Sequence, residues 1–336
     1  MKPRIALLPG DPCGIGPELL AKLLNDGEAT AKARIVVVGN EAVIASGQSV
    51  AGTDTPLTAL SDPAELKDRD GVALISVPGI DAASLPAGTI SETTGRWQLA
   101  CLKRAAELCI EGHADGICFA PLNKEAMHKG GLTYEDEQGF IADSLEYKGP
   151  MGLLNTLGAL WTSRVTSHVA LKKVSDLITI DSVLDAIRLV DGTLKVAGFD
   201  TPRLAVCGFN PHAGDGGNFG TEEIDAIGPA VEAAKSEGIN ASGPYPPDTI
   251  FLKGRDGVFD AIVTMFHDQG QIAMKLMGFD HGVTVHAGLP YPVTTSAHGS
   301  AFDIAGKGIA NVSALRHAFD VACNMAERIA GTANRS

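Results

Sequence analysis

The sequence predicts an α/β protein with two α/β/α domains and mostly parallel sheets. Short apolar runs that end in glycine alternate with longer segments in which apolar residues recur every three or four positions. This alternation is typical of parallel strands joined by helices that cover both faces of a sheet. The length of 336 residues exceeds what one hydrophobic core usually holds, so we expect two domains.

The strands are predicted from apolar runs bounded by turn-forming residues. The first run, residues 4–10, leads through a turn rich in glycine and proline into an amphipathic helix, whose first turn contains Pro17 and Glu18. Further strands are expected at 33–40 and 71–77, at the start of the segments 114–126, 202–217 and 260–270, and in the segment 164–174, where the strand leads to His168.

Four long helices are predicted from apolar residues spaced three and four positions apart, at residues 94–112, 179–194, 222–238 and 313–331. Thr179 or Asp181 caps the second helix, and Gly238 and Gly331 end the third and the fourth. Ligands in such folds bind at the carboxyl ends of parallel strands. The residues that follow each strand are therefore the first candidates for a site.

The composition excludes several classes of function. The formal net charge of −13 argues against a nucleic-acid-binding surface, because neutralising phosphates needs a basic face. No apolar run approaches the ~18 residues that span a bilayer, and Pro9 and Gly10 interrupt the first run, so we expect neither a membrane segment nor a signal peptide. The six cysteines show no CxxC spacing and are predicted to be reduced, buried thiols of a cytoplasmic protein.

Three histidines, His168, His212 and His267, lie at or near the ends of predicted strands. Imidazoles that converge from different strand ends can bind a divalent cation and leave a position open for substrate or water. His212 lies among glycines that let the backbone approach a ligand, and Asp268 follows His267 and could orient its ring or ligate. The alternative is that each histidine is a buried polar residue with satisfied hydrogen bonds. The pattern favours a metal site.

Two other patterns suggest anion binding. Residues 10–18, GDPCGIGPE, place glycines between a strand and a helix, as in loops that cradle phosphate, but they lack the dinucleotide and P-loop spacings. A tight structural turn is therefore favoured. Lys124 and Lys275 lie near strand ends among small or apolar residues. Each of them either holds an anionic substrate or assists proton transfer, or is an ordinary surface lysine.

A cofactor loop is predicted at residues 298–311, HGSAFDIAGKGIAN. Small residues surround Asp303, whose carboxylate can accept hydrogen bonds from both ribose hydroxyls and would repel a 2′-phosphate, which favours NAD over NADP. The alternative is a loop that only connects to the last helix and caps it. The candidate cofactor-binding residues are His298, Gly299, Ser300, Asp303 and Gly306.

Seven stretches in the same order along the chain resemble the 4-hydroxythreonine-4-phosphate dehydrogenase family of the vitamin B6 (pyridoxine) pathway. They are GDPCGIGPE, APLNKEA, SHVALKKV, GFNPHAGDGGNFGTEEID, GPYPPDTIF, FHDQGQIAMK and SAHGSAFDIAGKGIA. The last stretch also resembles the adenosine-binding loop of isopropylmalate dehydrogenase. The resemblance implies two α/β/α domains with an active-site cleft between them, which we place at residues 1–126 plus 290–336 and at residues 127–289. It also implies a homodimer with a shared active site, and the second domain would carry the metal and dimer contacts.

The resemblance further implies the reaction and its residues. The family oxidises a secondary alcohol with NAD(P)+, and the resulting β-keto acid loses CO2. A divalent cation, which could be Zn, Co, Mn or Mg, would be held by His168, His212 and His267, with one of them coming from the partner subunit. Asp248 and Lys275 match substrate-contact positions and are the candidates for moving protons.

Departures from the family pattern bear on the substrate. Asp136 and Glu137 are nearest to where the family has His-Thr-Glu, Thr284 stands at an expected Asn, and Thr294 stands about where an Arg is expected. Losing a histidine and an arginine removes phosphate ligands, and acidic residues repel phosphate. We therefore hypothesise a different, non-phosphorylated substrate, such as an aromatic cis-dihydrodiol carboxylate. A metal-binding relative without a redox step is the other alternative.

Overall fold

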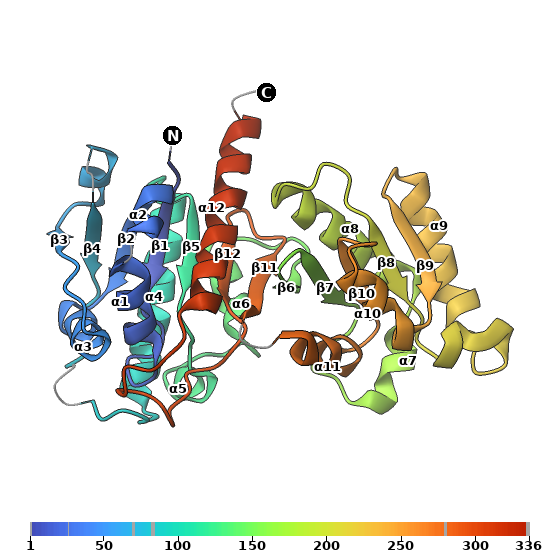
Figure 1. Cartoon of the computed structure of the whole chain (residues 1–336), viewed down its shortest axis with the longest axis horizontal. Helices are drawn as coiled ribbons and strands as arrows, with labels where there is room; N and C mark the ends of the chain where they lie inside the picture. The colour runs from blue at the N-terminus through green and yellow to red at the C-terminus, as the bar shows by residue number, and fades with distance from the viewer. Residues whose placement is uncertain (1, 26, 69–70, 82–84, 279–280, 334–336) are drawn as a thin grey trace. The chain divides into compact units, whose positions relative to one another are not determined.

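The computed structural model describes residues 2–25, 27–68, 71–81, 85–278 and 281–333 (Figure 1). The chain divides into two compact units, which we call the first unit (Met1–Gly149 with Leu289–Ser336) and the second unit (Pro150–Gly288). The expected return to the first domain at residue 290 is close to the observed one. The first crossing lies after Gly149 and not at the expected residue 126, because the helix that spans residue 126 (Lys124–Lys129) and the helix after it (Glu137–Ser144) pack against a long helix of the first unit.

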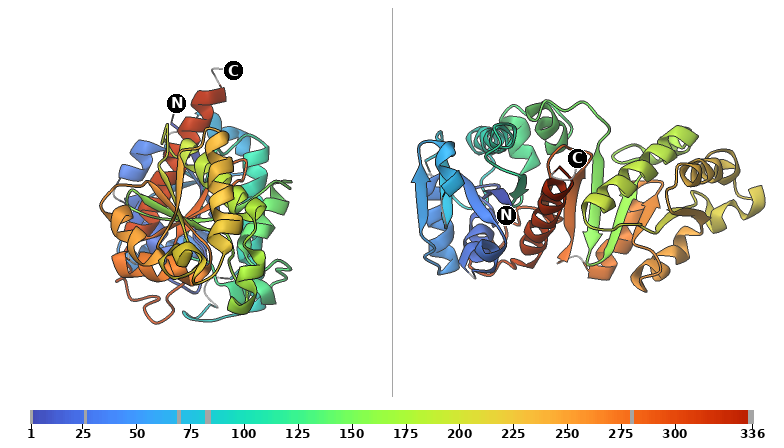
Figure 2. Two further views of the ribbon diagram at one scale, coloured as in Figure 1. Left: turned by 90° about the vertical axis from the view of Figure 1, so that its right-hand side faces the viewer. Right: turned by 90° about the horizontal axis from the view of Figure 1, so that it is seen from above.

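The first unit has a wholly parallel sheet in the order β3-β4-β2-β1-β5-β12. Its strands are β1 (Arg4–Leu8), β2 (Arg34–Gly39), β3 (Leu57–Leu60), β4 (Val72–Ser76), β5 (Gly116–Phe119) and β12 (Val293–Ser296). Its helices are α1 (Gly16–Asn25), α2 (Glu28–Lys32), α3 (Glu41–Ala51), α4 (Glu92–Ile110), α5 (Lys124–Lys129), α6 (Glu137–Ser144) and α12 (Ser313–Ala333), with a 3-10 segment at Pro63–Asp68. Helix α4 covers one face of this sheet, and α1 and α12 cover the other (Figure 2).

The core of the first unit follows from the alternation of side chains along its strands. Ala6 and Leu8 of β1 point to one face, where they share a buried cluster with Trp97 and Leu102 of α4. The intervening residue Leu7 is equally buried, because the opposite face is covered as well. This burial on both faces explains why the parallel strands read as continuous apolar runs in the sequence.

The second unit has a mixed sheet in the order β11-β6-β7-β10-β8-β9, in which β7, β10, β8 and β9 are parallel and β6 is antiparallel to both of its neighbours. Its strands are β6 (Gly152–Leu157), β7 (Leu160–Arg164), β8 (Leu204–Cys207), β9 (Ala241–Tyr245), β10 (Ala261–Thr264) and β11 (Val283–Ala287). Its helices are α7 (Val174–Leu177), α8 (Ile180–Val196), α9 (Gly228–Ser236), α10 (Pro247–Arg255) and α11 (His267–Gly278), with 3-10 segments at Leu171–Lys173 and Pro211–Gly217 and a π-helical turn at Glu223–Ile227.

The α/β class with a mostly parallel sheet is confirmed, and the four long helices lie close to their predicted positions. The strand expected within 164–174 was wrong, because it ends at Arg164 and the following segment is irregular. The actual strand, β7, was not predicted because it contains polar residues: Thr162 and Ser163 are almost fully buried in the middle of the sheet. The six cysteines are buried free thiols, as predicted. Within the ranges that the structure covers, no helix is long and apolar enough to cross a bilayer.

Candidate metal and cofactor sites

The four parallel strands of the second unit all end at the same edge of its sheet, which is where ligands bind in open α/β sheets. In spatial order, β7, β10, β8 and β9 lead into His168, His267, His212 and Asp248. The fold therefore collects at one edge residues that are separated by up to 99 positions in the sequence, from His168 to His267. Three imidazoles and a carboxylate make a donor set that suits a divalent metal ion.

His168 and His267 lie close together. Their ring centroids are 5.6 Å apart, and the planes are tilted by 48°. His267 begins α11, and its Nδ1 is 2.7 Å from Oδ1 of the adjacent Asp268, so the ring donates a hydrogen bond to the carboxylate. A histidine held in this way presents Nε2 as the nitrogen available to a ligand. Because the His267 side chain is 36% exposed, that nitrogen can be reached from solvent.

His212 lies in a strained loop. In the 3-10 segment Pro211–Gly217, the backbone is left-handed from His212 to Gly216, with φ of 54° at His212 and Ala213 and 45° at Asp215. Each such L-residue costs roughly 1–2 kcal/mol, so other contacts must hold the loop. The His212 ring contacts Phe219, 6.1 Å between centroids. In the part of the chain that is described, no three His, Cys, Asp or Glu side chains come close enough to hold one metal ion.

Glu223 holds the His212 loop and was missed by the sequence reasoning. Its carboxylate is almost fully buried and accepts hydrogen bonds from the backbone N–H groups of Phe209 and Asn210, both at 2.7 Å, and from the Asn210 side chain at 3.0 Å. The neighbouring Glu222 also accepts from Asn210, at 2.7 Å, and its pKa is lowered by hydrogen bonds from Ser175 and Asn210. The signal in the sequence that could have identified Glu223 is the acidic pair Glu222 and Glu223, which follows a glycine-rich loop.

The predicted catalytic residues flank the same edge of the second unit. Asp248 is in the first turn of α10, and Lys275 lies two turns after His267 on α11; both are exposed. The predicted substrate residue Thr284 of β11 accepts a hydrogen bond from Asn155 Nδ2 at 3.0 Å. The Asn155 Oδ1 atom in turn accepts from Arg164 Nη1 at 3.1 Å, so Thr284 belongs to a polar network that reaches the end of β7.

The remaining predicted substrate residues belong to the first unit. Lys124 begins α5, and its Nζ lies 3.4 Å from Oε2 of Glu137 on α6. Asp136 caps α6, because its Oδ1 accepts from the Gln138 N–H at 3.0 Å. Thr294 is fully buried, and its hydroxyl donates to the Ala318 carbonyl oxygen at 2.8 Å. This bond joins β12 to α12, so we do not carry a substrate role for Thr294 forward.

The predicted cofactor loop lies against residues 10–18 of the first unit. The Ile15 N–H donates to the Ser300 carbonyl oxygen at 3.0 Å, and a Cβ on Gly14 would lie 2.8 Å from the same oxygen. The glycine-rich turn thus supports the loop, which agrees with a structural turn. His298 and Ser300 are half-buried, whereas Gly299, Asp303 and Gly306 are exposed.

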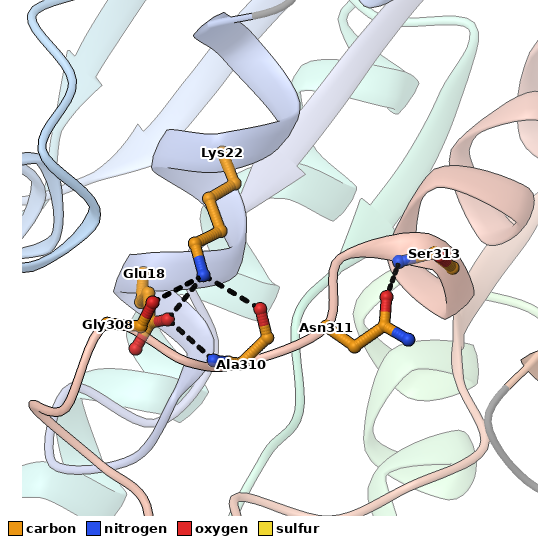
Figure 3. Close-up of polar contacts among 6 residues, drawn as sticks. All are labelled: Glu18, Lys22, Gly308, Ala310, Asn311 and Ser313. Carbon is orange, nitrogen blue, oxygen red and sulfur yellow. Dashed lines mark hydrogen bonds and ion pairs between the residues drawn. The ribbon is translucent and has the colours of Figure 1, made fainter.

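A buried ion pair holds the far end of this loop (Figure 3). Glu18 of α1 is only 2% exposed, and its Oε1 accepts from the Ala310 N–H at 2.8 Å and from Lys22 Nζ at 2.7 Å. Lys22 also donates to the carbonyl oxygens of Gly308 and Ala310, at 3.0 and 2.8 Å. The sequence marked Glu18 only as a helix-start residue, since its partner lies almost 300 positions away.

Asp11 is a fully buried carboxyl group in the glycine-rich turn of residues 10–18. Its Oδ1 accepts from the Cys13 N–H at 3.0 Å, and its Oδ2 has no hydrogen-bond partner in the described structure. Burial raises its pKa from 3.8 to about 6. The ionised form is therefore disfavoured in the folded state, so the contribution of this group to stability falls as the pH rises from about 4 to about 6.

We expect Asp11→Asn to remove this pH dependence. The free energy of unfolding of the wild type, minus that of the variant, should decrease between pH 4 and pH 7, because only the wild type must ionise a buried group. Urea titrations at several pH values measure this difference. A difference that stays flat over that range, or that increases, would contradict an elevated pKa for Asp11.

Comparisons with known proteins identify the family of the chain. The family model described as pyridoxal phosphate biosynthetic protein PdxA matches residues 31–322. A relative from Pseudomonas aeruginosa, named "Putative 4-hydroxythreonine-4-phosphate dehydrogenase 2", is 49% identical over 327 residues, which cover 96% of this chain and 97% of the relative. The D-threonate 4-phosphate dehydrogenase of Pectobacterium atrosepticum is 39% identical, over 96% of this chain and 99% of that enzyme.

The fold agrees as well. The crystal structure of 4-hydroxythreonine-4-phosphate dehydrogenase from Klebsiella pneumoniae superposes with a TM-score of 0.85 at 35% identity, covering 97% of this chain and 98% of that one. Family model, sequence and fold each extend over most of the chain, which therefore belongs to the PdxA family of pyridoxal phosphate biosynthetic proteins.

Proposed function

We propose that the protein is an NAD-linked, metal-dependent dehydrogenase that oxidises a secondary alcohol of a small phosphorylated hydroxy acid, followed by loss of CO2. The observation that carries the proposal is the pairing of His168 and His267 at the strand-end edge, with Asp268 orienting one ring, in a chain of this family. The earlier hypothesis of a non-phosphorylated substrate is not favoured, because relatives at up to 49% identity are named for phosphorylated ones.

Each residue of the proposed site has a distinct chemical role. His168, His267 and His212 would hold a divalent metal, which when bound lowers the pKa of a substrate hydroxyl and polarises the carbonyl formed from it. The Asp268 carboxylate keeps the His267 ring in one tautomer. Lys275 places an ammonium group near an anionic substrate, and the exposed Asp248 carboxylate is the group that can accept the hydroxyl proton.

The cofactor proposal depends on the loop at 298–311. Contacts of Ser300 with Ile15 and of Ala310 with Glu18 hold the loop near both of its ends, while Asp303 between them is exposed. A carboxylate in that position accepts hydrogen bonds from ribose hydroxyls and repels a 2′-phosphate, so we propose NAD and not NADP as the preferred cofactor.

We further propose that two copies associate through the surface beside the histidines. Large apolar side chains on the segments that carry these histidines are exposed in one chain, and exposed apolar surface of this kind marks protein–protein contacts. In such a dimer, His212 would reach the partner's metal, which fits the finding that the described residues of one chain contain no group of three potential ligands. Light scattering that gives the mass of one chain would refute this. The exposed residues are Val169 (42%), Leu171 (69%), Phe219 (51%), Ile272 (59%) and Leu276 (84%).

The substrate proposal is tested by following NAD reduction with zinc, manganese or magnesium present. We expect turnover of 4-phosphohydroxy-L-threonine or D-threonate 4-phosphate, with kcat/KM at least roughly tenfold above that of the same compounds without phosphate, since a charge-assisted contact contributes about 1.5–3 kcal/mol. Comparing kcat/KM for the two phosphorylated compounds shows which relative's named substrate this protein prefers. Equal turnover with and without phosphate would restore the non-phosphorylated hypothesis, and NADP preferred over NAD would contradict the role of Asp303.

A further inference from the structure

Gln269 joins two of the strand ends that lead into the candidate ligands. It lies two residues after His267 in the first turn of α11. Its Oε1 accepts a hydrogen bond from the Met265 N–H at 2.7 Å, directly after β10, and its Nε2 donates to the Gly208 carbonyl oxygen at 2.9 Å, directly after β8. One planar amide thus bridges the end of the strand before His267 and the start of the loop that carries His212.

The bridge continues in both directions along the edge of the sheet. The Gly208 N–H donates to the Tyr245 carbonyl oxygen at 2.8 Å, which ties β8 to the end of β9. The Met265 carbonyl oxygen accepts from the Thr166 N–H at 3.1 Å and from the Thr166 hydroxyl at 2.9 Å, which ties β10 to the segment that leads to His168. All four strand ends are therefore connected, and Gln269 supplies the side-chain link between β10 and β8.

The packing around Gly208 allows little adjustment. A Cβ at this position would lie 2.8 Å from the Ala213 Cα and 3.0 Å from Glu223 Oε1, so the turn after β8 is closely packed against the His212 loop. A shift of the Gly208 carbonyl would be transmitted to that loop, which is already strained by its left-handed residues.

We propose that Gln269 is a positioning residue, which fixes the His212 loop relative to His267 and thereby sets the metal affinity of the protein. The inference rests on the proposed metal site. The amide supplies both the donor and the acceptor that these two backbone groups need, and an ionised glutamate would place an acceptor oxygen against the Gly208 carbonyl. Gln269 would have this role whether His212 and His267 of one chain bind the same ion or, in a dimer, two different ions.

The test compares Gln269→Glu with a matched control, Gln98→Glu. Gln98 of α4 is a buried amide in the first unit that also bridges two backbone groups, accepting from the Asn123 N–H at 2.9 Å and donating to the Thr94 carbonyl oxygen at 3.1 Å. Zinc affinity is measured by competition with a chromophoric chelator, and the unfolding midpoint is measured without metal. We expect both variants to lower the midpoint, but only Gln269→Glu to weaken zinc binding, by about 10- to 100-fold.

Zinc affinity within about twofold of the wild type in Gln269→Glu, together with a lowered midpoint, would reduce Gln269 to a structural link and overturn the inference. Equal losses of affinity in both variants would do the same. Wild-type protein that binds no divalent metal would instead remove the proposed function on which the inference rests. If Gln269→Glu does not fold, Gln269→Leu removes both hydrogen bonds of the same amide without adding a charge and should also weaken zinc binding, whereas unchanged affinity would count against the inference.

Discussion

Replacing His267 with alanine is expected to remove nearly all zinc affinity and dehydrogenase activity. The ring is one of two imidazoles that the fold brings to within 5.6 Å of one another, so its removal leaves an incomplete ligand set. Asp268→Ala should have the smaller effect of about 10- to 100-fold, because the ring remains and only its orientation is lost. Zinc competition and NAD reduction measure the two quantities independently.

The control for this pair is His128→Ala. His128 is an exposed histidine of α5 in the first unit, and its Nδ1 contacts the Leu132 carbonyl oxygen. Its replacement should leave zinc affinity unchanged. If His267→Ala binds zinc as tightly as the control does, the metal site lies elsewhere and the assignment of the strand-end histidines is wrong.

Gly95→Ala is expected to be the most damaging single-methyl substitution considered, with a loss of about 3 kcal/mol or more in the free energy of unfolding. A Cβ at Gly95 would lie 1.7 Å from the carbonyl oxygen of Ala126, so α4 and α5 cross with no space for a methyl group. The obstacle is backbone, which cannot rotate away as a side chain would. Relief therefore requires the two helices to separate.

The matched control is Gly192→Ala. Gly192 lies inside α8 with open space around its Cα, so the same substitution should stabilise the protein by about 0.5–1 kcal/mol through better helix propensity. Each unit contains one tryptophan, Trp97 and Trp161. In a Trp161→Phe background, the fluorescence of Trp97 during urea titration therefore reports the first unit, which contains Gly95. In a Trp97→Phe background, the fluorescence of Trp161 reports the second unit, which contains Gly192. A Gly95→Ala protein as stable as its parent would mean that the helices do not cross so closely.

The local pattern of the sequence predicted the elements that are buried on both faces. The run around Ile5 and the spacing within α4 identify a strand and a helix, because burial there requires apolar residues at fixed intervals. The same reasoning could place His212 and His267 at strand ends, since each follows such a run. It could not find the antiparallel pair β6 and β11, whose sequences are 126 positions apart from Leu157 to Val283 and carry polar residues such as Asn155.

The contacts that support the site could not be predicted from the sequence, for a related reason. Gln269 and Glu223 bind backbone groups of the loop after β8, and the identity of a residue does not show that its backbone has such a partner. Thr294 shows a different difficulty. It was predicted to contact the substrate because its position was matched by counting from a motif, whereas its hydroxyl bonds to α12 in the interior. Alignment by motif fixes order along the chain but says nothing about which way a side chain points.

The left-handed turn at His212 has a consequence for protein engineering. Such a turn is the mirror image of an ordinary helical turn, so it aims the imidazole in a direction that a right-handed turn built from L-amino acids does not provide. A designer who moved this histidine to another scaffold would have to transplant Gly214 and Gly216 and the Glu223 carboxylate with it. Conversely, a synthetic chain with D-alanine at position 213 should adopt the turn without strain at that residue, which makes this loop a suitable place for building a metal site with mirror-image residues.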